Sequence, residues 1–431
     1  MSKPTAPQSA TFRKSGSSAL VIGGGIAGLL AAHMLKDRFS EVTVLERATY
    51  VDPATSGPAA RPSVPQSHCL HMLMGAGALA FDELVPGWRA ELIAQGAVPF
   101  DAGADMALRV ASGWLPRVGT GITLYGASRC LIEAALLALL RDAGNVRIQT
   151  GQRVIGIELA KDGARVQGVR LQPVDEVEES FLQADIVVDA SGAASRLPRW
   201  LARQFGAEHQ IAMTEHASGR QYVSRWVRLA PDHAPDWQGL ALAPTPETGG
   251  RAGMMIRAER DLWGVVLQAP DGTALPTDDR SFLTLSAELS DPALHNVLVQ
   301  AEPAGPVHLF GRTVNRRRHY EDYPNWPDNL FALGDSVCAL DPYAGLGMTA
   351  AARGVQLLSH HLDRPGRQFQ ARLAEHNKWP WRIATDAGTG CANRLASLTK
   401  AAPFDPSLAQ LLLEVQHMLR KPETLSEEAV A

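Results

Sequence analysis

Residues 23–28 have the types and spacing that can hold the phosphates of a nucleotide. Gly23, Gly25 and Gly28 form a G-x-G-x-x-G pattern, with Ile26 and Ala27 before the last glycine. The first glycine permits a tight bend, the second lets a pyrophosphate approach the backbone, and the third lets a helix pack closely on a strand. Free N–H groups at the start of that helix attract the anion. The pattern therefore predicts a dinucleotide site.

Glu46 supports this interpretation because it stands 18 residues after Gly28, at the end of the next expected strand. A carboxylate there can accept both hydroxyls of a ribose, which favours an unphosphorylated ribose. Arg47 follows it directly in the chain. The alternative is a Gly-rich turn without a ligand, but a strand, a helix and an acid in register favour the dinucleotide.

The elements that must position these residues form a βαβ unit. Ala19–Ile22 is a short apolar run, Ile26–Lys36 has helical spacing, and Glu41–Glu46 alternates in the manner of a strand. Alternating runs between residues 221 and 269 predict an antiparallel sheet inserted between the halves of the nucleotide-binding domain. The remaining expected elements are strands at 146–150, 184–189 and 329–333, a hairpin over 152–171, and helices at 70–85, 128–143, 281–289, 293–302 and 380–420.

Composition limits the class of protein. The 431 residues are 45% hydrophobic and 20% charged, which is typical of a soluble globular chain with more than one core. The formal net charge of -4 disfavours nucleic acid as a partner, and no apolar run reaches the ~18 residues of a transmembrane helix. The scattered cysteines disfavour a disulfide framework or a metal site and fit a reducing cytoplasm. Residues 1–18 are expected to be a disordered leader.

A second Gly-rich segment points to the kind of nucleotide. Gly334 and Asp335 follow an expected strand, and a turn then runs through Pro342 and Gly345 into an expected helix. This segment resembles the Gly-Asp motif of FAD-dependent aromatic hydroxylases and polyene epoxidases. The resemblance implies that Asp335 binds the ribityl chain of FAD and that the turn lies under the flavin ring. The dipole of the helix that it opens would favour the anionic reduced flavin.

The resemblance extends from about residue 19 to residue 420. Residues 187–198 resemble a region implicated in FAD and nicotinamide binding, and residues 61–68 resemble the loop that carries a flavin-facing arginine, here Arg61. Arg129 matches an arginine that opens a helix beside the cofactor. Residues 315–320 and 380–385 resemble later landmarks of one branch of the family. The residues assigned to the cofactor are Gly23, Gly25, Ile26, Ala27, Gly28, Glu46, Arg47, Arg61, Arg129, Val154, Gly334, Asp335, Pro342, Gly345, Leu346, Gly347 and Met348.

The turn also departs from the epoxidase pattern. Ala344 and Leu346 stand where Tyr and Gln are usual, and Asp341 stands where Asn is usual. The first two changes remove polar groups from the expected substrate side of the flavin. The substrate of the epoxidases therefore cannot be carried over to this chain.

The implied fold is α/β, with a Rossmann-like FAD-binding domain of the glutathione-reductase type, an inserted antiparallel β-sheet substrate domain and a helical C-terminal region. The FAD-binding domain would comprise residues 19–80, 125–200 and 310–375. The substrate-side domain would comprise 81–124 and 201–309, and the helical region 376–431.

The implied activity is that of an FAD-dependent monooxygenase. NADPH or NADH would reduce FAD, or a separate flavin reductase would supply the electrons. O2 would add at flavin C4a, and the hydroperoxide would hydroxylate or epoxidise an apolar or aromatic secondary metabolite in a dry pocket. Arg61 and Tyr343 are expected beside the isoalloxazine as catalytic residues. Three alternatives stay open: Baeyer–Villiger oxygenation, hydrogen transfer at a C–C bond without oxygen insertion, and a role in which FAD is structural.

Missing motifs narrow the alternatives. Only one G-x-G-x-x-G has the right setting, which argues against enzymes with a second nicotinamide-binding domain. No lysine lies between Lys36 and Lys161, which argues against a flavin-dependent halogenase.

Several residues have two interpretations. His68, Cys69 or His71 could link covalently to the flavin, although a structural role is more common. The run 316–318 of three arginines could bind a nicotinamide phosphate or form an ordinary loop. Met254 and Met255 alternate, so one of them can line a pocket while the other packs in the core. The amphipathic run 408–419 could touch a membrane or pack over the domain.

Overall fold

The structure is a computed structural model that describes residues 14–50, 61, 64–206, 210–311, 313–385 and 390–421. A five-stranded parallel sheet forms its centre, in the order β20-β11-β1-β2-β7. These strands are β20 (Leu330–Ala332), β11 (Ile186–Asp189), β1 (Lys14–Ile22), β2 (Phe39–Leu45) and β7 (Val146–Gln149). Most of their central residues are buried, as expected of short β-branched and apolar runs in a parallel sheet. The carboxyl ends of the parallel strands, including β1 and β2, lie at the same edge of the sheet. Both Gly-rich segments lie at this edge.

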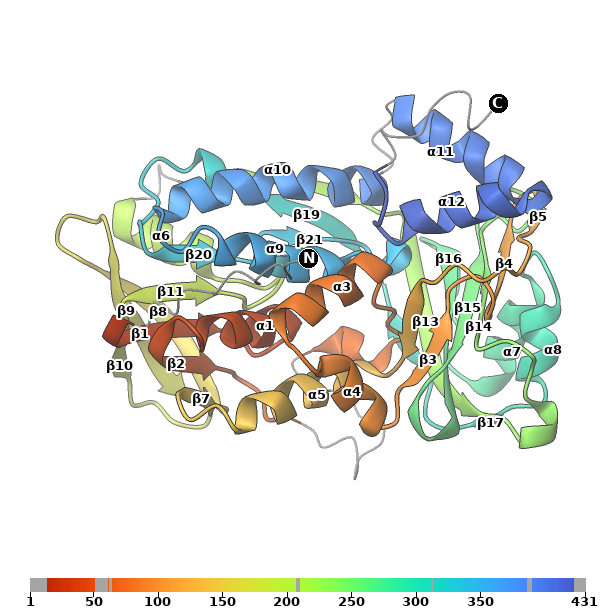
Figure 1. Ribbon diagram of the computed structural model, residues 1–431, viewed down its shortest axis with the longest axis horizontal. Helices are drawn as coiled ribbons and strands as arrows, with labels where there is room; N and C mark the ends of the chain where they lie inside the picture. The colour runs from red at the N-terminus through yellow and green to blue at the C-terminus, as the bar shows by residue number, and fades with distance from the viewer. Residues whose placement is uncertain are drawn as a thin grey trace, which may run out of the picture.

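Helices cover this sheet. α1 (Ile26–Leu35) follows β1 directly and packs with α5 (Arg129–Arg141), α3 (Gly75–Leu84) and α9 (Gly347–Ser359) (Figure 1). Ser128 caps α5 by accepting the Leu131 N–H at 3.2 Å, as its N-cap position predicts. The shared core is built from leucine, valine and aromatic side chains of helix and sheet, including Leu29, Val187 and Phe331.

Two small sheets extend the domain. The predicted hairpin is confirmed by β8 (Gln152–Leu159) and β9 (Val166–Pro173), with β10 (Ser180–Gln183) at its edge. Its turn uses Gly163 at φ +71°, a conformation that glycine adopts readily. A second sheet has the order β12 (Met213–Ala217), β19 (Val314–Arg318) and β21 (Cys338–Ala339).

The inserted antiparallel sheet is confirmed and is larger than expected. It comprises β4 (Met106–Val110), β5 (Gly113–Trp114), β13 (Arg220–Arg228), β14 (Gly239–Leu242), β15 (Ala252–Arg257), β16 (Leu262–Pro270), β17 (Glu302–Pro303) and β18 (His308–Phe310). α7 (Asp279–Ala287) and α8 (Ala293–Leu298) cover its outer face (Figure 1). Its other face is turned toward the half of the molecule that contains the parallel sheet, and it forms a wall of the cavity described below.

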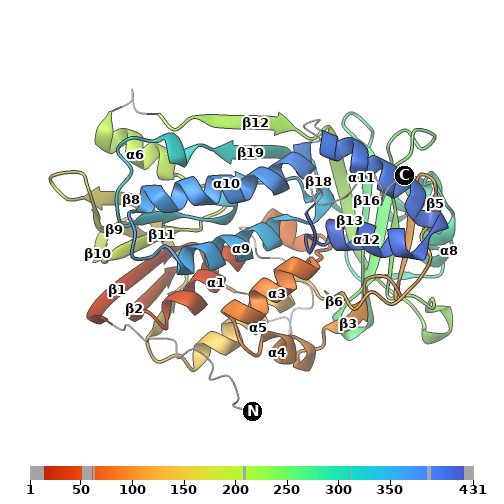
Figure 2. The same ribbon diagram turned by 45° about the horizontal axis from the view of Figure 1, so that its top comes forward.

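The C-terminal helices extend from the parallel sheet, where the first of them runs beside α9, to the inserted sheet, where the other two lie near β4 and β5 (Figure 2). They are α10 (Gly366–Thr385), α11 (Gly390–Ala401) and α12 (Pro406–Gln416). α12 buries Leu412 and Val415 against Val110 and Leu115, which supports packing for the amphipathic run. In the described part of the chain, no helix is both long enough and apolar enough to span a bilayer.

The other elements are short. They are α4 (Trp88–Ala94), α6 (Leu197–Phe205), β3 (Val98–Asp101), β6 (Thr123–Gly126) and the 3-10 turns Pro65–His68, Pro231–His233, Glu259–Asp261, Tyr320–Asp322, Gly334–Ser336, Pro342–Ala344 and Ala402–Phe404.

Several expected boundaries differ from the structure. β1 begins at Lys14, so the end of the predicted leader belongs to a strand, because ladder hydrogen bonds to β2 do not require apolar side chains. Residues 1–13 lie outside the described part. Residues 81–97 pack with the half that contains the parallel sheet, since Phe81, Trp88 and Leu92 belong to its core. α10 begins at Gly366 and crosses the expected boundary at 375/376, with Pro380 inside the helix.

Candidate functional site

A cavity of about 1390 Å³ joins the two Gly-rich corners to the inserted sheet. Drug-sized ligands occupy pockets of roughly 300–1,000 Å³, so the cavity has room for a dinucleotide together with a substrate. The predicted site residues that line it are Gly23, Gly25, Ile26, Ala27, Glu46, Arg47, Arg61, Arg129, Val154, Asp335, Pro342, Tyr343, Gly345, Leu346, Gly347 and Met348. Gly28 and Gly334 are not part of the lining, and both serve the packing behind it.

The glycine turn has the geometry that its sequence implies. Gly23 has φ +97°, and a Cβ there would lie 2.6 Å from the Ala190 carbonyl oxygen. A Cβ on Gly28 would lie only 1.8 Å from the Gly23 carbonyl oxygen, so this glycine lets α1 pack against the turn. A Cβ on Gly25 would meet nothing closer than an Arg129 nitrogen at 3.5 Å. The backbone at Gly25 is therefore open to a ligand such as a pyrophosphate.

Glu46 lies at the end of β2 in a buried network of charges. Its carboxylate accepts the Gly24 N–H at 2.7 Å and pairs with Arg61 at 2.9 Å. Arg61 also pairs with Glu133 at 2.8 Å and lies over the Tyr50 ring. Burial alone would lower the pKa of Arg61, but Glu133 and Glu46 raise it above its ordinary value. The arginine is therefore permanently charged and fixes both carboxylates.

Arg61 is held at the corner formed by the glycine turn and the end of β2. It is 2% exposed, and it donates to the Gly24 carbonyl oxygen at 3.1 Å as well as to the two carboxylates. It also lines the cavity. Its expected role beside the isoalloxazine stays a prediction.

Glu133 is a site residue that motif reasoning did not single out. It joins Arg61 to Arg129, whose Nε lies 3.0 Å from the second Glu133 oxygen. Arg129 and Glu133 are four residues apart on α5, so they share a face of the helix. That spacing, directly after a capped helix start, was the available signal in the sequence. Arg129 itself faces Gly25 across the cavity, in reach of an anion there.

The Gly-Asp corner meets the glycine turn directly. Gly334 has φ +58°, and a Cβ there would lie 3.0 Å from the Ala27 side chain. The adjacent Asp335 carboxylate lines the cavity and accepts no hydrogen bond from the described residues. Burial raises the pKa of Asp335, although Arg129 and Arg318 lower it in part. A carboxylate that no described residue engages can accept hydrogen bonds from the hydroxyl groups of a ribityl chain.

The turn that follows is held to the inserted sheet by Asp341. Its buried carboxylate accepts the Tyr222 hydroxyl at 2.5 Å, the Thr313 hydroxyl and the Tyr343 N–H at 3.0 Å. Its own N–H donates to Asn315 Oδ1 at 2.7 Å. A carboxylate has acceptor sites for all three donors, more than the single oxygen of an asparagine amide offers.

The turn leads into a helix N-terminus that faces the cavity. Gly345 has φ +63°, and a Cβ there would lie 2.4 Å from Met74 Cε. α9 begins at Gly347, and the N-cap residue Leu346 makes no side-chain cap. The first N–H groups of α9 therefore remain for a ligand, and with the helix dipole they suit the electron-rich edge of a flavin.

Tyr343 is the other predicted catalytic residue. It lines the cavity, is 44% exposed, and stacks with the Arg220 guanidinium at 4.5 Å from the ring centre. Its position in the turn agrees with the expected neighbourhood of the flavin ring. A catalytic role for Tyr343 stays a prediction.

The substrate side of the cavity is mainly apolar. Met254 lines it, whereas Met255 is fully buried on the opposite face under α7 and α8, as alternation predicts. Trp237 and Trp263 also pack in that outer core, with ring centres 5.5 Å apart. Other apolar side chains of the lining are Leu70, Met72, Met74, Met106, Leu108, Val266, Phe310, Ile383, Leu395 and Leu413.

The residues weighed for covalent attachment separate into two groups. His68 stacks on His308, with ring centres 3.9 Å apart, and lies outside the lining. Cys69 and His71 line the cavity. Burial raises the pKa of Cys69 to about 11, and burial followed by Arg129 lowers the pKa of His71 to about 4. Cys69 is therefore a neutral thiol, and His71 a neutral imidazole, at neutral pH.

The three arginines of residues 316–318 are largely engaged within the protein. Arg318 donates to the Ser336 and Ala193 carbonyl oxygens at 2.8 and 2.7 Å. Arg317 pairs with Glu321 at 2.7 Å, and Arg316, which lines the cavity, pairs with Glu215 at 2.6 Å. The structural interpretation of the run is therefore favoured.

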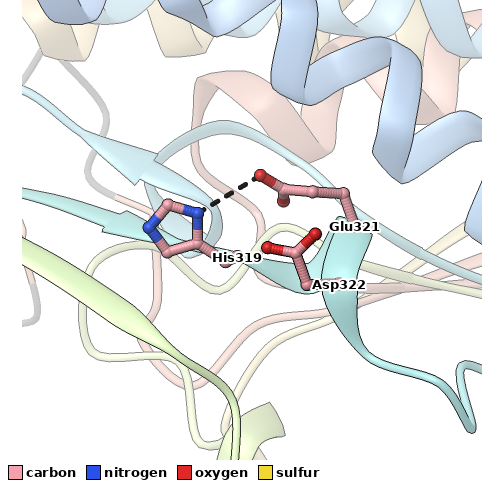
Figure 3. Close-up of side chains that lie close together, drawn as sticks. All are labelled: His319, Glu321 and Asp322. Atoms are coloured by element: carbon pink, nitrogen blue, oxygen red, sulfur yellow. Dashed lines mark hydrogen bonds and ion pairs between the residues drawn. The ribbon is translucent and has the colours of Figure 1, made fainter.

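Glu321 also belongs to a cluster outside the cavity, formed with His319 and Asp322 (Figure 3). The possible ligand atoms lie within 4.8 Å of one another. However, His319 Nδ1 lies 3.3 Å from Glu321, and its Nε2 bonds the Thr214 hydroxyl at 2.7 Å. With Arg317 on the same carboxylate, the cluster is an ion-pair network at the end of β19.

Comparison with known proteins supports the assignment of the site. The FAD binding domain family matches residues 17–367. Protein Rv3254 of Mycobacterium tuberculosis is 31% identical over 363 residues, which cover 80% of this chain and 72% of that protein. Two solved structures share the fold. P. aeruginosa PqsL in complex with 2-aminobenzoylacetate has a TM-score of 0.65 and 15% identity, and covers 92% of this chain and 99% of PqsL. A mutant of 2-methyl-3-hydroxypyridine-5-carboxylic acid oxygenase has a TM-score of 0.63 and 17% identity, and covers 94% of this chain and 98% of the oxygenase.

The family match spans the glycine turn, the Glu46 network and the Asp335 corner, and residues of all three line one cavity. This chain therefore belongs to the FAD binding domain family, and it is an FAD-dependent oxidoreductase.

Proposed function

We propose that the chain is a monooxygenase that uses NADPH or NADH and O2 to hydroxylate or epoxidise an apolar or aromatic secondary metabolite. One observation carries the proposal: both flavin corners line a cavity that continues along the apolar face of the inserted sheet. A dehydrogenase could use the same cofactor corner. A large apolar chamber beside the flavin turn suits oxygen transfer to an organic substrate, since water must be kept from the site.

The residues of this chain have separable roles in the proposal. Gly25 and Arg129 would hold the pyrophosphate, Glu46 the adenosine ribose, and Asp335 the ribityl chain. The start of α9 would face the isoalloxazine edge. When bound, FAD supplies the redox chemistry, accepting a hydride and activating oxygen.

The protein wall then determines what reaches the flavin. Met72, Met254 and Val266 present flexible or apolar surface that excludes water and accepts rings of different shape. The molecules named with the two structural neighbours, 2-aminobenzoylacetate and a hydroxypyridine carboxylic acid, are small aromatics. They support an aromatic substrate here. The three cysteines with described side chains form no disulfide with one another, which suits a reducing cytoplasm.

The proposal is tested by anaerobic mixing of the FAD-loaded protein with NADPH or NADH, with and without a panel of aromatic compounds. Bleaching of the flavin that a compound accelerates identifies the donor and the substrate class together. Readmission of ¹⁸O-labelled oxygen should then place one label in the product. Product formed without label contradicts the proposal and favours hydrogen transfer, and label in an ester or lactone favours Baeyer–Villiger oxygenation.

A further inference from the structure

A polar side chain, Gln268, stands on the sheet face of the cavity beside the flavin turn. It lies on β16 opposite Tyr222 on β13 and Ala252 on β15. Directly opposed residues of neighbouring strands point to the same face, and all three line the cavity. Because Tyr222 bonds Asp341, this row of the sheet lies directly against the turn.

Only one of the two polar atoms of the Gln268 amide makes a hydrogen bond. The side chain is 5% exposed, and its Nε2 donates to the Gly250 carbonyl oxygen at 3.2 Å. Its Oε1 receives no hydrogen bond from the described residues. A buried acceptor without a donor destabilises a protein, so a site that keeps one invites a ligand explanation.

The neighbouring side chains on this face carry no donor or are engaged elsewhere. The Tyr222 hydroxyl donates to Asp341, and the Ser224 hydroxyl, one row along, donates to the Val265 carbonyl oxygen. The Arg220 guanidinium stacks on Tyr343. The side chains of Ala252, Val266 and Met254 have no polar hydrogen. Gln268 Oε1 therefore receives no donor from the described residues, and a molecule in the cavity would supply one.

We propose that Gln268 is a specificity-determining residue that accepts a hydrogen bond from an O–H or N–H group of the substrate. The inference rests on the proposed function and names the substrate class more closely: an apolar aromatic molecule with a hydrogen-bond donor. A site built around a polar group rejects analogues that lack the matching group. The bond also fixes which edge of the substrate faces the turn of residues 341–348.

The test compares matched pairs of probes on the FAD-loaded protein by titration calorimetry. The pairs are phenol and benzene, 2-naphthol and naphthalene, and 9-phenanthrol and phenanthrene. We expect the protein to bind the hydroxylated member of at least one pair roughly 5- to 100-fold more tightly. In Gln268→Leu this ratio should fall to about 1, through weaker binding of the hydroxylated member alone. Gln268→Glu keeps an acceptor and should keep the preference.

Gln370→Leu is the matched control. Gln370 is 1% exposed, donates to the Ala332 carbonyl oxygen at 3.3 Å and has an unpaired Oε1, but it lies outside the cavity lining. Its substitution should leave the ratio unchanged. The inference is overturned if no pair shows a preference, if Gln268→Leu keeps it, or if Gln370→Leu removes it equally. If the preference depends on Gln268 but no labelled oxygen enters any product, the monooxygenase proposal fails and the inference stands.

Discussion

The two ends of the cavity are built on different principles. At the nucleotide end, Arg61, Glu46 and Glu133 form buried ion pairs beside a glycine turn in which Gly23 and Gly28 leave no room for a side chain. At the sheet end, the wall is methionine, leucine and valine, with few polar contacts. The first end recognises one invariant chemical group, whereas the second is shaped to exclude water and to accept an apolar molecule. The cofactor can therefore be inferred from single residues of the sequence, whereas the substrate cannot.

The largest expected effect on stability is that of Arg61→Met, at the nucleotide end of the cavity. This change leaves the carboxylates of Glu46 and Glu133 buried without their shared cation, and breaking a buried pair in this way costs about 3–5 kcal/mol. Urea unfolding of the apoprotein should show that loss in the free energy of unfolding, and FAD titration should show weaker binding. The neighbouring Arg47→Met, at an exposed position, serves as the control and should change stability little. Equal stability of the two variants would contradict the network.

Substitutions of Met255 and Met254 test the two faces of the inserted sheet separately. Met255→Ala should lower the free energy of unfolding by about 2–5 kcal/mol, because it opens a cavity in a fully buried core. Met254→Ala should cost less and should change the affinity of aromatic probes, since this side chain lines the cavity. Chemical denaturation and calorimetry distinguish the effects. A larger stability loss in Met254→Ala would reverse the assigned faces.

Substitutions of Gly28 and Gly25 distinguish a glycine needed for packing from a glycine needed for the approach of a ligand. Gly28→Ala forces a methyl group against the Gly23 carbonyl oxygen, and such overpacking costs about 1–3 kcal/mol. A Cβ in Gly25→Ala makes only an ordinary contact with an Arg129 nitrogen at 3.5 Å. Because Gly25 is the N-cap of α1, where glycine is favoured over alanine, apoprotein stability should fall by about 1 kcal/mol or less. Its FAD affinity should nevertheless fall, because the methyl group occupies the place of the pyrophosphate. Full FAD affinity in Gly25→Ala would show that the phosphates lie elsewhere.

The smallest effect concerns Asp335 and pH. Its pKa is raised by burial, so the folded protein binds this proton more tightly than the unfolded chain. Wild-type apoprotein should therefore lose stability from this group as pH rises above the ordinary carboxyl pKa of about 3.9. Asp335→Asn lacks that loss, so its stability relative to wild type should increase from pH 4 toward pH 7 in urea titrations. The buried Asp189 is present in both proteins and cancels. A relative stability that is flat or falls with pH would be the contrary result.

Much of the fold followed from patterns that depend on short-range physics. The glycine spacing, the Ser128 cap and the Lys161–Gly163 turn each impose a local conformation, and the structure contains all three. Boundaries were less predictable. The stretch from 81 to 97 was assigned to the substrate side, yet Phe81 and Trp88 pack in the core of the FAD-binding half. Which core an amphipathic helix joins depends on distant partners that its own pattern does not specify.

The candidate site divides in the same way. Sequence by itself determined the dinucleotide corner, because phosphate and ribose recognition requires backbone N–H groups, small residues and a carboxylate at fixed spacing. Only the tertiary structure decided that Arg61 pairs with Glu46 and Glu133, and that Met254 and Gln268 face the cavity. Those outcomes depend on contacts between segments tens to hundreds of residues apart, where burial and charge pairing select one arrangement among many that the local sequence permits.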